Sequence, residues 1–260
     1  MSLEVIPIGR LGNQIIRNLA TSLLAEKHDF CVKYSSYEYI STLGIPLYNG
    51  KNIYPETREI KESEYINILN SNKLNQNLNI DRAYCQTVEI IKVIYDYIRS
   101  EEVKYLVMQK NPYKNRYNNN NDCFIHIRLG DILGKYHLPI SYYLNTLKKI
   151  DINNVDNIYI STNEESINDE YLKPLFETYP DKIKLIIADE IITMQFASTC
   201  KYLILSQGTF SSCIGYIAFF SQIYWTEMEK DKVWCGDLFI ENDVDASWIK
   251  IKHNEYMNAA

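Results

Sequence analysis

A short apolar strand that leads directly into polar residues decides the fold, and its sequence is Cys123-Phe124-Ile125-His126-Ile127-Arg128-Leu129-Gly130-Asp131. The apolar first half is typical of a strand buried in a parallel sheet, and the glycine-containing second half is typical of the loop that follows it. Short apolar runs continue to alternate with amphipathic stretches as far as Trp225. This alternation predicts an α/β protein with an open, mostly parallel sheet.

The periodicity places the strands and helices of this sheet one after another. We expect strands at residues 123–127, 155–161, 183–188, 201–205 and 222–225, and helices at residues 141–150, 170–179, 191–199 and 210–220. In an open parallel sheet, ligands bind at the carboxyl ends of the strands, in the loops that lead to the helices. Those loops are therefore the candidate ligand-binding segments.

The chain opens with its own strand, loop and helix. A strand at residues 3–8, a helix with apolar positions from Ile15 to Leu24 and a strand at residues 30–34 predict a first β-α-β unit.

The segments that follow set the expected domain boundaries. Residues 43–80 carry a weaker pattern, residues 85–106 predict a helix, and the polar tract 110–121 predicts a loop or linker. We expect an N-terminal Rossmann-like domain of residues 1–115, a second domain of residues 122–232, and a tail of residues 233–260 whose helix at 246–256 packs back on the N-terminal half.

Charge and composition exclude several classes of protein. With 27 Lys and Arg against 33 Asp and Glu, the net charge of −6 provides no general attraction for nucleic acid or anionic lipid. The six cysteines form no C-x-x-C pair, which favours reduced thiols over a zinc ribbon or a disulfide framework. No stretch approaches 18 apolar residues, and no basic segment precedes the first apolar run, so we expect a soluble, cytoplasmic protein of bacterial or viral type without integral membrane contact.

The first candidate loop is Gly9-Arg10-Leu11-Gly12-Asn13-Gln14. Its two glycines allow the backbone to approach a ligand closely, and the helix that follows offers free N–H groups with a partial positive charge. It matches neither the G-x-G-x-x-G fingerprint nor the Walker A sequence. By spacing alone, a tight structural turn is the simpler interpretation.

The second candidate loop follows the strand that ends at His126. Alternation along a strand sends His126 and Arg128 to the same side, so both can contact one ligand. Arg128 can hold a phosphate through two hydrogen bonds without losing its charge, and His126 can bond a ribose or phosphate oxygen. The alternative is an ion pair between Arg128 and Asp131 that only closes the loop.

The third candidate loop is Ser206-Gln207-Gly208-Thr209-Phe210-Ser211, again between a strand and a helix. Helix N–H groups, supplemented by the hydroxyls of Thr209 and Ser211, form an anion site that needs no lysine. The alternative is an N-cap supplied by Thr209 or Ser211, which is compatible with a phosphate at the same helix end.

Taken in order, these loops resemble motifs of the α-1,2-fucosyltransferase family. Five segments carry the resemblance: 9–14 is similar to G-G/R-L-G-N-Q, 126–131 to H-x-R-R-G-D, 159–163 to a strand ending in Thr-Ser or Ser-Asp, 189–194 to an acidic residue before a D-x-x-x-M-type helix, and 200–218 to C-x-h-x-I-x-x-x-G-T-F-x-x-W-x-x-x-L. The resemblance covers residues 1–30 and 122–225, while residues 35–110 do not align. The sequence departs from the family at Leu129, where a second arginine is expected, and at Ser212-Cys213, in place of an aromatic pair.

The resemblance implies a GT-B-like architecture, in which two Rossmann-like halves with mostly parallel sheets face each other across a cleft. It implies a galactoside α-1,2-fucosyltransferase: an inverting enzyme that moves L-fucose from GDP-L-fucose to the 2-hydroxyl of a terminal sugar, such as galactose, of a glycan acceptor. The N-terminal domain would lie on the acceptor side, and the second domain would bind the GDP-sugar. Two alternatives stay open: a GT-B transferase that uses another nucleotide sugar, or an inactive relative that binds glycans.

No cofactor and no metal are implied. Arg128 and the helix end at Thr209 can stabilise the charge that develops on the GDP leaving group, which is the task of a metal in other enzymes. The four histidines lack ligand spacing, and Asp243-Val244-Asp245, although of D-x-D form, lies near the end of the sequence, outside any nucleotide-binding β-α-β unit.

The resemblance also assigns roles to individual residues. Asn13 would face the reacting fucose, and Phe210 with Asp189 or Glu190 would border the guanine nucleoside. The resemblance does not identify the base that takes the acceptor proton; by position in the sequence the candidates are Asp131, the nearest carboxylate in a motif, and His137. The implied catalytic residues are Arg128, Asn13, Asp131 and His137. The implied donor-binding residues are Gly12, His126, Arg128, Asn163, Asp189, Glu190, Ser206, Gly208, Thr209, Phe210 and Ser211.

Overall fold

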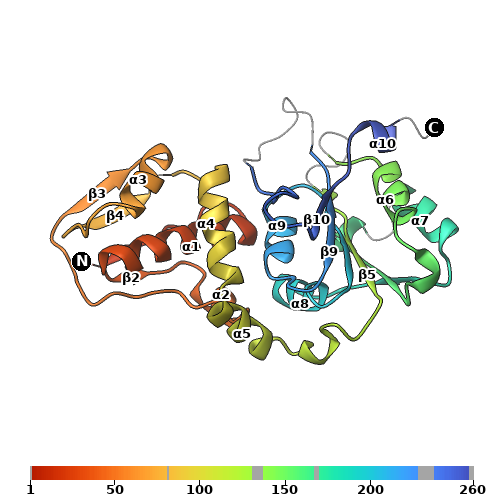
Figure 1. Ribbon diagram of the computed structural model, residues 1–260, viewed down its shortest axis with the longest axis horizontal. Coiled ribbons are helices and arrows are strands. Elements are labelled where there is room, and N and C mark those ends of the chain that lie inside the picture. The colour runs from red at the N-terminus through yellow and green to blue at the C-terminus, as the bar shows by residue number, and fades with distance from the viewer. Residues whose placement is uncertain (1, 81, 131–136, 167–169, 228–236, 258–260) are drawn as a thin grey trace. The chain divides into compact units, whose positions relative to one another are not determined.

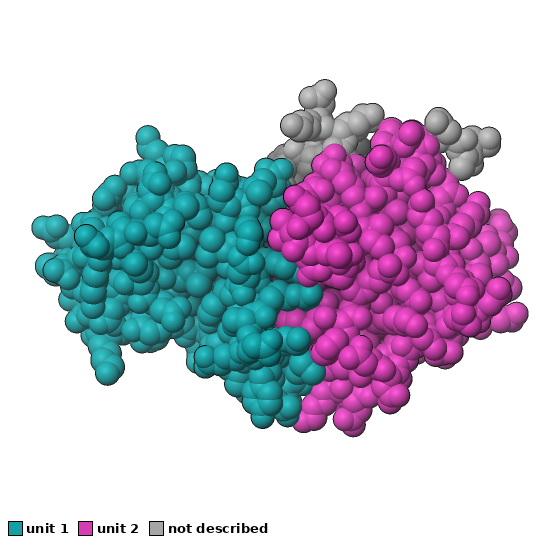
Figure 2. Space-filling view, viewed as in Figure 1, with its two compact units in different colours: residues 1–111, 236–238 teal, residues 112–235, 239–260 magenta. Residues whose placement is uncertain are grey.

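A computed structural model describes residues 2–80, 82–130, 137–166, 170–227 and 237–257 of the chain. The chain divides into two compact units, one of residues 1–111 with 236–238 and the other of residues 112–235 with 239–260 (Figure 2). Among the described residues, no helix combines the length and the apolar character needed to cross a membrane. The described cysteines are free thiols.

The second unit is built on a six-stranded, fully parallel sheet with the strand order β10-β9-β8-β5-β6-β7. Figure 1 labels three of these strands, β5, β9 and β10, together with the helices that surround the sheet. Its strands are β5 (Cys123–His126), β6 (Ile158–Ser161), β7 (Ile183–Leu185), β8 (Tyr202–Ile204), β9 (Gln222–Trp225) and β10 (Trp248–Lys250). Its helices are α6 (Ile140–Leu147), α7 (Lys173–Thr178), α8 (Glu190–Ala197), α9 (Thr209–Tyr216) and α10 (Asn254–Met257). The α/β class predicted from the alternation is confirmed.

The two faces of β5 differ in what they contact. Ile125, Ile127 and Leu129 are fully buried in one apolar cluster that includes Tyr142 of α6. His126, on the other face, contacts α9. Strict alternation thus continues past the end of the strand, and it sends the polar residues to the α9 side of the sheet.

The C-terminal segment differs from the expectation. Residues 239–257 belong to the second unit, and the predicted helix at 246–256 is instead the parallel strand β10 followed by the short helix α10. The reason is the side chain of Trp248, which is fully buried and reaches the place where Gly215 of α9 has no Cβ atom. An indole packed under a helix anchors the segment as the edge strand of the sheet.

The first unit begins with the predicted β-α-β unit, in which β1 (Leu3–Glu4) and β2 (Val32–Lys33) are parallel and joined by α1 (Leu11–His28). A second parallel pair, β3 (Thr57–Ile60) with β4 (Asn77–Ile80), lies in the segment of weak pattern. Within the described residues these are two separate two-stranded sheets. The unit also contains α2 (Tyr37–Thr42), α3 (Tyr65–Leu69), α4 (Val88–Arg99) and α5 (Glu101–Lys110).

The helix expected at residues 85–106 is interrupted at Ser100. This residue has an extended backbone, with φ −58° and ψ 147°, and it separates α4 from α5. Its hydroxyl donates to Tyr97 O over 2.8 Å, which satisfies a carbonyl of the last turn of α4. Serine bonds its local backbone readily, and periodicity alone does not detect such a break.

Several single turns of 3₁₀ helix complete the described elements. They are η1 (Glu62–Glu64), η2 (Lys114–Arg116), η4 (Ile152–Asn154), η5 (Glu164–Ser166) and η6 (Glu170–Leu172).

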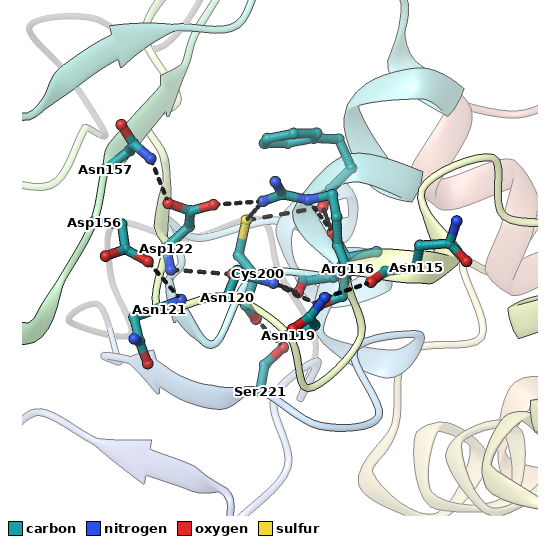
Figure 3. Close-up of polar contacts among 12 residues, drawn as sticks. Asn115, Arg116, Asn119, Asn120, Asn121, Asp122, Asp156, Asn157, Cys200 and Ser221 are labelled. Carbon is teal, nitrogen blue, oxygen red and sulfur yellow. Dashed lines mark hydrogen bonds and ion pairs between the residues drawn. The ribbon is translucent and has the colours of Figure 1, made fainter.

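The polar tract before β5 is anchored to the second unit by Arg116 (Figure 3). Its guanidinium donates to Asp122 Oδ2 over 2.7 Å and to Thr199 Oγ1 over 3.0 Å, and it lies 4.4 Å from the ring centroid of Phe196. Asp122 also accepts from Asn157 over 2.8 Å. This cluster, which we call the Arg116 cluster, joins the tract to the amino ends of β5, β6 and β8, opposite the edge at which ligands of such sheets bind.

Candidate functional site

The carboxyl ends of β5 and β8 bring the second and third candidate loops together. The two strands are neighbours, with Ile125 opposite Ile204. The backbone N–H of Ser206 donates to His126 O over 3.2 Å, so the loop after β8 begins beside the end of β5. The segments that the sequence singled out separately therefore form one site.

The N-terminus of α9 points into this site without a side-chain cap. Gly208 occupies the N-cap position with φ 103° and ψ 165°, and the first hydrogen bond of the helix runs from Ser212 N to Gly208 O over 3.1 Å. The expectation that Thr209 or Ser211 caps the helix is wrong, because neither residue occupies that position and the Ser211 hydroxyl bonds His126 instead. The first N–H groups of a helix have no partner inside it, and they carry a partial positive charge.

The guanidinium of Arg128 lies beside the same helix end. Its Nη1 atom is 2.6 Å from the position that a Cβ atom of Gly208 would take. A full positive charge and a helix N-terminus thus meet at one point, and this combination favours an anion. The alternative ion pair with Asp131 stays a prediction, because Asp131 lies outside the described residues.

His126 is buried in the same group of residues. Its Nδ1 atom is 2.6 Å from Ser211 Oγ and 3.1 Å from Ser206 Oγ, and its ring centroid is 5.0 Å from that of Phe210. Burial, and then the charge of Arg128, lower the pKa of His126 from 6.5 to about 3. The imidazole is therefore neutral at physiological pH, and it can act as a hydrogen-bond donor but not as a cation.

Leu129 does not alter the charged side of the site. Its side chain is fully buried in the apolar cluster on the face of the sheet opposite Arg128. An arginine at this position would have to leave that cluster to reach an anion beside Arg128. The departure from the family motif therefore leaves the α9 side of the loop unchanged.

Gly130 and Asn163 extend the site towards β6. Gly130 has φ 61°, and the side-chain carbon Cγ of Asn163 is 3.1 Å from the position of its absent Cβ atom. Asn163 thus packs against the loop that follows Arg128. Its contact with a donor stays a prediction.

Asp189 and Glu190 lie at the start of α8. Asp189 is the N-cap, and its Oδ1 atom accepts from Ile192 N over 2.8 Å. Both side chains are exposed, in the loop region that follows β7. The capping bond accounts for Asp189 structurally, and the contact of either residue with a nucleoside stays a prediction.

The first candidate loop belongs to the first unit. Gly9 has φ 74°, and Asn13 Nδ2 is 2.3 Å from the position of its absent Cβ atom, so only glycine allows Asn13 to lie there. Gly12, the second residue of α1, is buried. The loop is thus both the tight turn of the simpler interpretation and the start of a helix.

Gln86 and Glu62 are residues of this region that sequence reasoning missed. Gln86 Nε2 donates to Asn13 Oδ1 over 2.8 Å, and the Gln86 backbone N–H donates to Glu62 Oε1 over 2.6 Å. Because the Asn13 oxygen is occupied, its amide nitrogen is the atom turned towards Gly9. Neither residue lies in a motif, so no signal in the sequence could have identified them.

The two candidate bases are not placed equally. The ring of His137 packs edge-on against Tyr171, with 5.3 Å between the centroids. Asp131 lies outside the described residues.

Among the described residues, no group of three His, Cys, Asp or Glu side chains could hold a metal ion.

Solved structures with the same fold are glycosyltransferases. The chain resembles the E. coli heptosyltransferase WaaC, solved with ADP, over 97% of this chain and 93% of that chain, with a TM-score of 0.51 and 8% identity. It resembles the E. coli ADP-heptose lps heptosyltransferase II over 100% of this chain and 95% of that chain, with a TM-score of 0.54 and 7% identity. At such low identity the likeness shows the fold alone, and it confirms the GT-B-like fold class. No protein-family model and no curated protein sequence matches the chain.

Proposed function

We propose that this protein is an inverting glycosyltransferase that moves L-fucose from GDP-L-fucose to the 2-hydroxyl of a terminal sugar, such as galactose, of a glycan. The observation that carries the proposal is the approach of Arg128 to the uncapped N-terminus of α9, at the carboxyl edge of a parallel sheet. The GT-B-like fold and the five fucosyltransferase-like segments support it.

The chemistry of the donor suits this site. When the bond between fucose and GDP breaks, negative charge develops on the departing diphosphate. Fixed donors aimed at that charge lower the barrier, and the guanidinium of Arg128 and the first N–H groups of α9 are such donors. We therefore propose that transfer needs no metal, since these groups supply the charge stabilisation.

The remaining roles follow from the loops. Thr209 and Phe210 would contact the nucleotide, with Asn163 on the far side of Gly130. Asn13, held by Gln86, would contact the reacting sugar and the attacking hydroxyl. Asp131 and His137 both stay candidates for the general base.

A second candidate is transfer from an ADP-activated sugar. The specific observation that favours it is the likeness to the two heptosyltransferases, whose descriptions name ADP and ADP-heptose. An anion site made of Arg128 and a helix end binds the diphosphate of either nucleotide. The preference for guanine or adenine must therefore be tested directly.

The deciding experiment is a binding screen followed by a hydrolysis assay. Calorimetric titration with GDP-fucose, GDP-mannose, UDP-galactose and ADP-heptose identifies the donor, and hydrolysis of the bound donor shows whether the protein is active. We expect selective binding of GDP-fucose and turnover unaffected by excess EDTA. Binding of glycans without any nucleotide sugar would instead support an inactive relative, and activity lost in EDTA and restored by manganese would contradict metal independence.

A further inference from the structure

Two buried serines hold the imidazole of His126 on one side. Nδ1 lies 2.6 Å from Ser211 Oγ and 3.1 Å from Ser206 Oγ, and the two hydroxyl oxygens are 3.1 Å apart. Ser206 is 1% exposed and Ser211 is fully buried. The three polar atoms form a triangle, and the Ser206 hydroxyl also forms a hydrogen bond with the buried hydroxyl of Tyr143. Both serine hydroxyls are thus occupied by other groups of the protein.

The positions of the protons follow from the donors and acceptors in this triangle. With a hydrogen on Nδ1, the ring N–H would have to donate to Ser211 over 2.6 Å, which is shorter than the usual range of about 2.7 to 3.2 Å for an N–H donor. With Nδ1 unprotonated, Ser211 donates to Nδ1 over 2.6 Å, a length typical of an O–H donor, and Ser206 donates to Nδ1 or to Ser211. The second arrangement agrees with the 2.6 Å distance, and it also satisfies both hydroxyl protons.

The ring hydrogen then lies on Nε2. Among the described residues, the imidazole makes its hydrogen bonds through Nδ1 alone, so Nε2 is available to a ligand. An N–H at this position donates to an oxyanion, whereas a bare nitrogen would present a lone pair to it. Because burial keeps the ring uncharged, the tautomer decides whether His126 attracts or repels an anion.

We propose that Ser206 and Ser211 are positioning residues that fix His126 as the Nε2–H tautomer, so that it donates to a diphosphate oxygen of the nucleotide. The identity of the ligand rests on the proposed function, while the tautomer does not. Arg128 supplies the charge of the site, and His126 supplies a neutral donor of fixed direction. Such a donor adds selectivity for the geometry of a diphosphate without adding a second buried charge.

The tautomer can be read directly by nitrogen NMR of the ¹⁵N-histidine-labelled protein without nucleotide. A His126→Asn variant assigns the His126 signals among the four histidines. We expect Nε2 to be protonated and Nδ1 unprotonated between about pH 6 and 8, and a Ser206→Ala/Ser211→Ala variant to show a mixture of tautomers. A fold that is merely less stable would not change this ratio.

Ser212→Ala is the matched control, since Ser212 is equally buried in the same helix turn and donates to Thr209 O over 3.0 Å. Calorimetric titration with GDP completes the test. We expect roughly a 10-fold loss of affinity in the double variant and little change in the control.

A protonated Nδ1 in the wild-type protein would overturn the inference, as would equal GDP losses in the double variant and the control. Wild-type protein that binds no nucleotide would overturn the proposed function and the ligand side of the inference. Because the tautomer is measured without nucleotide, the two failures are distinguishable.

Discussion

Arg128 lies against Gly208 so closely that Nη1 is 2.6 Å from the position a Cβ atom would occupy. Gly208 also has φ 103°, a conformation that residues with a side chain rarely adopt. The guanidinium of Arg128 can therefore lie at the start of α9 only because Gly208 has no side chain. The methyl group of an alanine at position 208 would displace it.

Gly208→Ala is expected to displace the guanidinium and to lower GDP affinity by roughly 10-fold or more, with some loss of stability from the strained backbone. Calorimetric titration of GDP measures the effect. If displacement of Arg128 is the cause, the Gly208→Ala/Arg128→Ala variant binds no more weakly than Arg128→Ala alone. Additive losses in the double variant would show that Gly208 acts independently.

Arg128→Ala is expected to lower turnover with GDP-fucose by roughly 10²- to 10³-fold, as is typical when one group that stabilises developing charge is removed. Folding should persist, because the side chain is only half-buried at the edge of the sheet. Arg128→Lys keeps the charge but loses the two-pronged geometry, so it should recover part of the activity. Near-native turnover of a folded Arg128→Ala protein would remove the assigned role and favour the ion pair with Asp131.

The architecture of the second unit was predictable because its core is patterned simply. Apolar runs of strand length alternate with helical periods between residues 123 and 225, and each predicted element there corresponds to an observed one. The place of the site was predictable for the same reason, since glycine and hydroxyl residues follow buried strands at a known edge.

The parts that could not be predicted depend on contacts between distant segments. Ser211 was expected to cap its own helix or to meet a ligand, yet it bonds His126, 85 positions away. Trp248 turns an irregular tail into a strand by packing under α9. Gln86 meets Asn13 across 73 positions. Local propensity and spacing carry no information on such pairings.

Acid should destabilise the protein through His126. Its pKa is about 3 in the folded state and 6.5 when exposed, so below pH 6.5 the unfolded chain binds more protons and stability falls as the pH falls. Between pH 7 and pH 5 the loss is about 2 kcal/mol. Urea unfolding at both pH values checks this.

Histidine variants separate His126 from other titrating groups. His126→Asn should remove this part of the pH dependence, whereas substitution of the exposed His253 by Asn should leave it intact. Buried His28, whose pKa is also lowered by burial, contributes to acid sensitivity in the same direction. Equal pH dependence in wild-type and His126→Asn proteins would contradict the assignment.

The Arg116 cluster is expected to contribute to stability without affecting the site. Arg116→Met leaves the carboxylate of Asp122, only 4% exposed, without its 2.7 Å partner. Because the guanidinium is a quarter exposed, the expected loss is about 2 kcal/mol, below the value for a fully buried pair. Arg58→Met is the control, since its 3.0 Å pair with Glu64 is exposed and should be worth less than about 1 kcal/mol. Equal losses in the two variants, measured by urea unfolding, would show that burial of Asp122 is unimportant.

The hydrogen bond from Gln86 to Asn13 leads to the last prediction, which separates nucleotide binding from sugar transfer. Asn13 belongs to the first unit, and Thr209 to the second unit, in which Arg128 and α9 form the anion site. If Asn13 contacts only the sugar and the attacking hydroxyl, Asn13→Ala should leave GDP affinity intact and lower transfer by roughly 10²-fold, the effect of misplacing reactants by about 1 Å. Gln86→Leu should lower transfer by a smaller factor, because Asn13 is still present but its side-chain amide no longer accepts the hydrogen bond from Gln86.

Thr209→Ala provides the opposite pattern, since we expect it to weaken GDP itself. Calorimetric titration of GDP, alongside turnover at saturating donor, is measured for all three variants. Equal losses of GDP affinity in Asn13→Ala and Thr209→Ala would show that both residues bind the nucleotide. The assignment of sugar contact to Asn13 and of nucleotide contact to Thr209 would then be wrong. A full transfer rate in Gln86→Leu would show instead that Asn13 keeps its orientation without the bond, because its position over Gly9 is then sufficient.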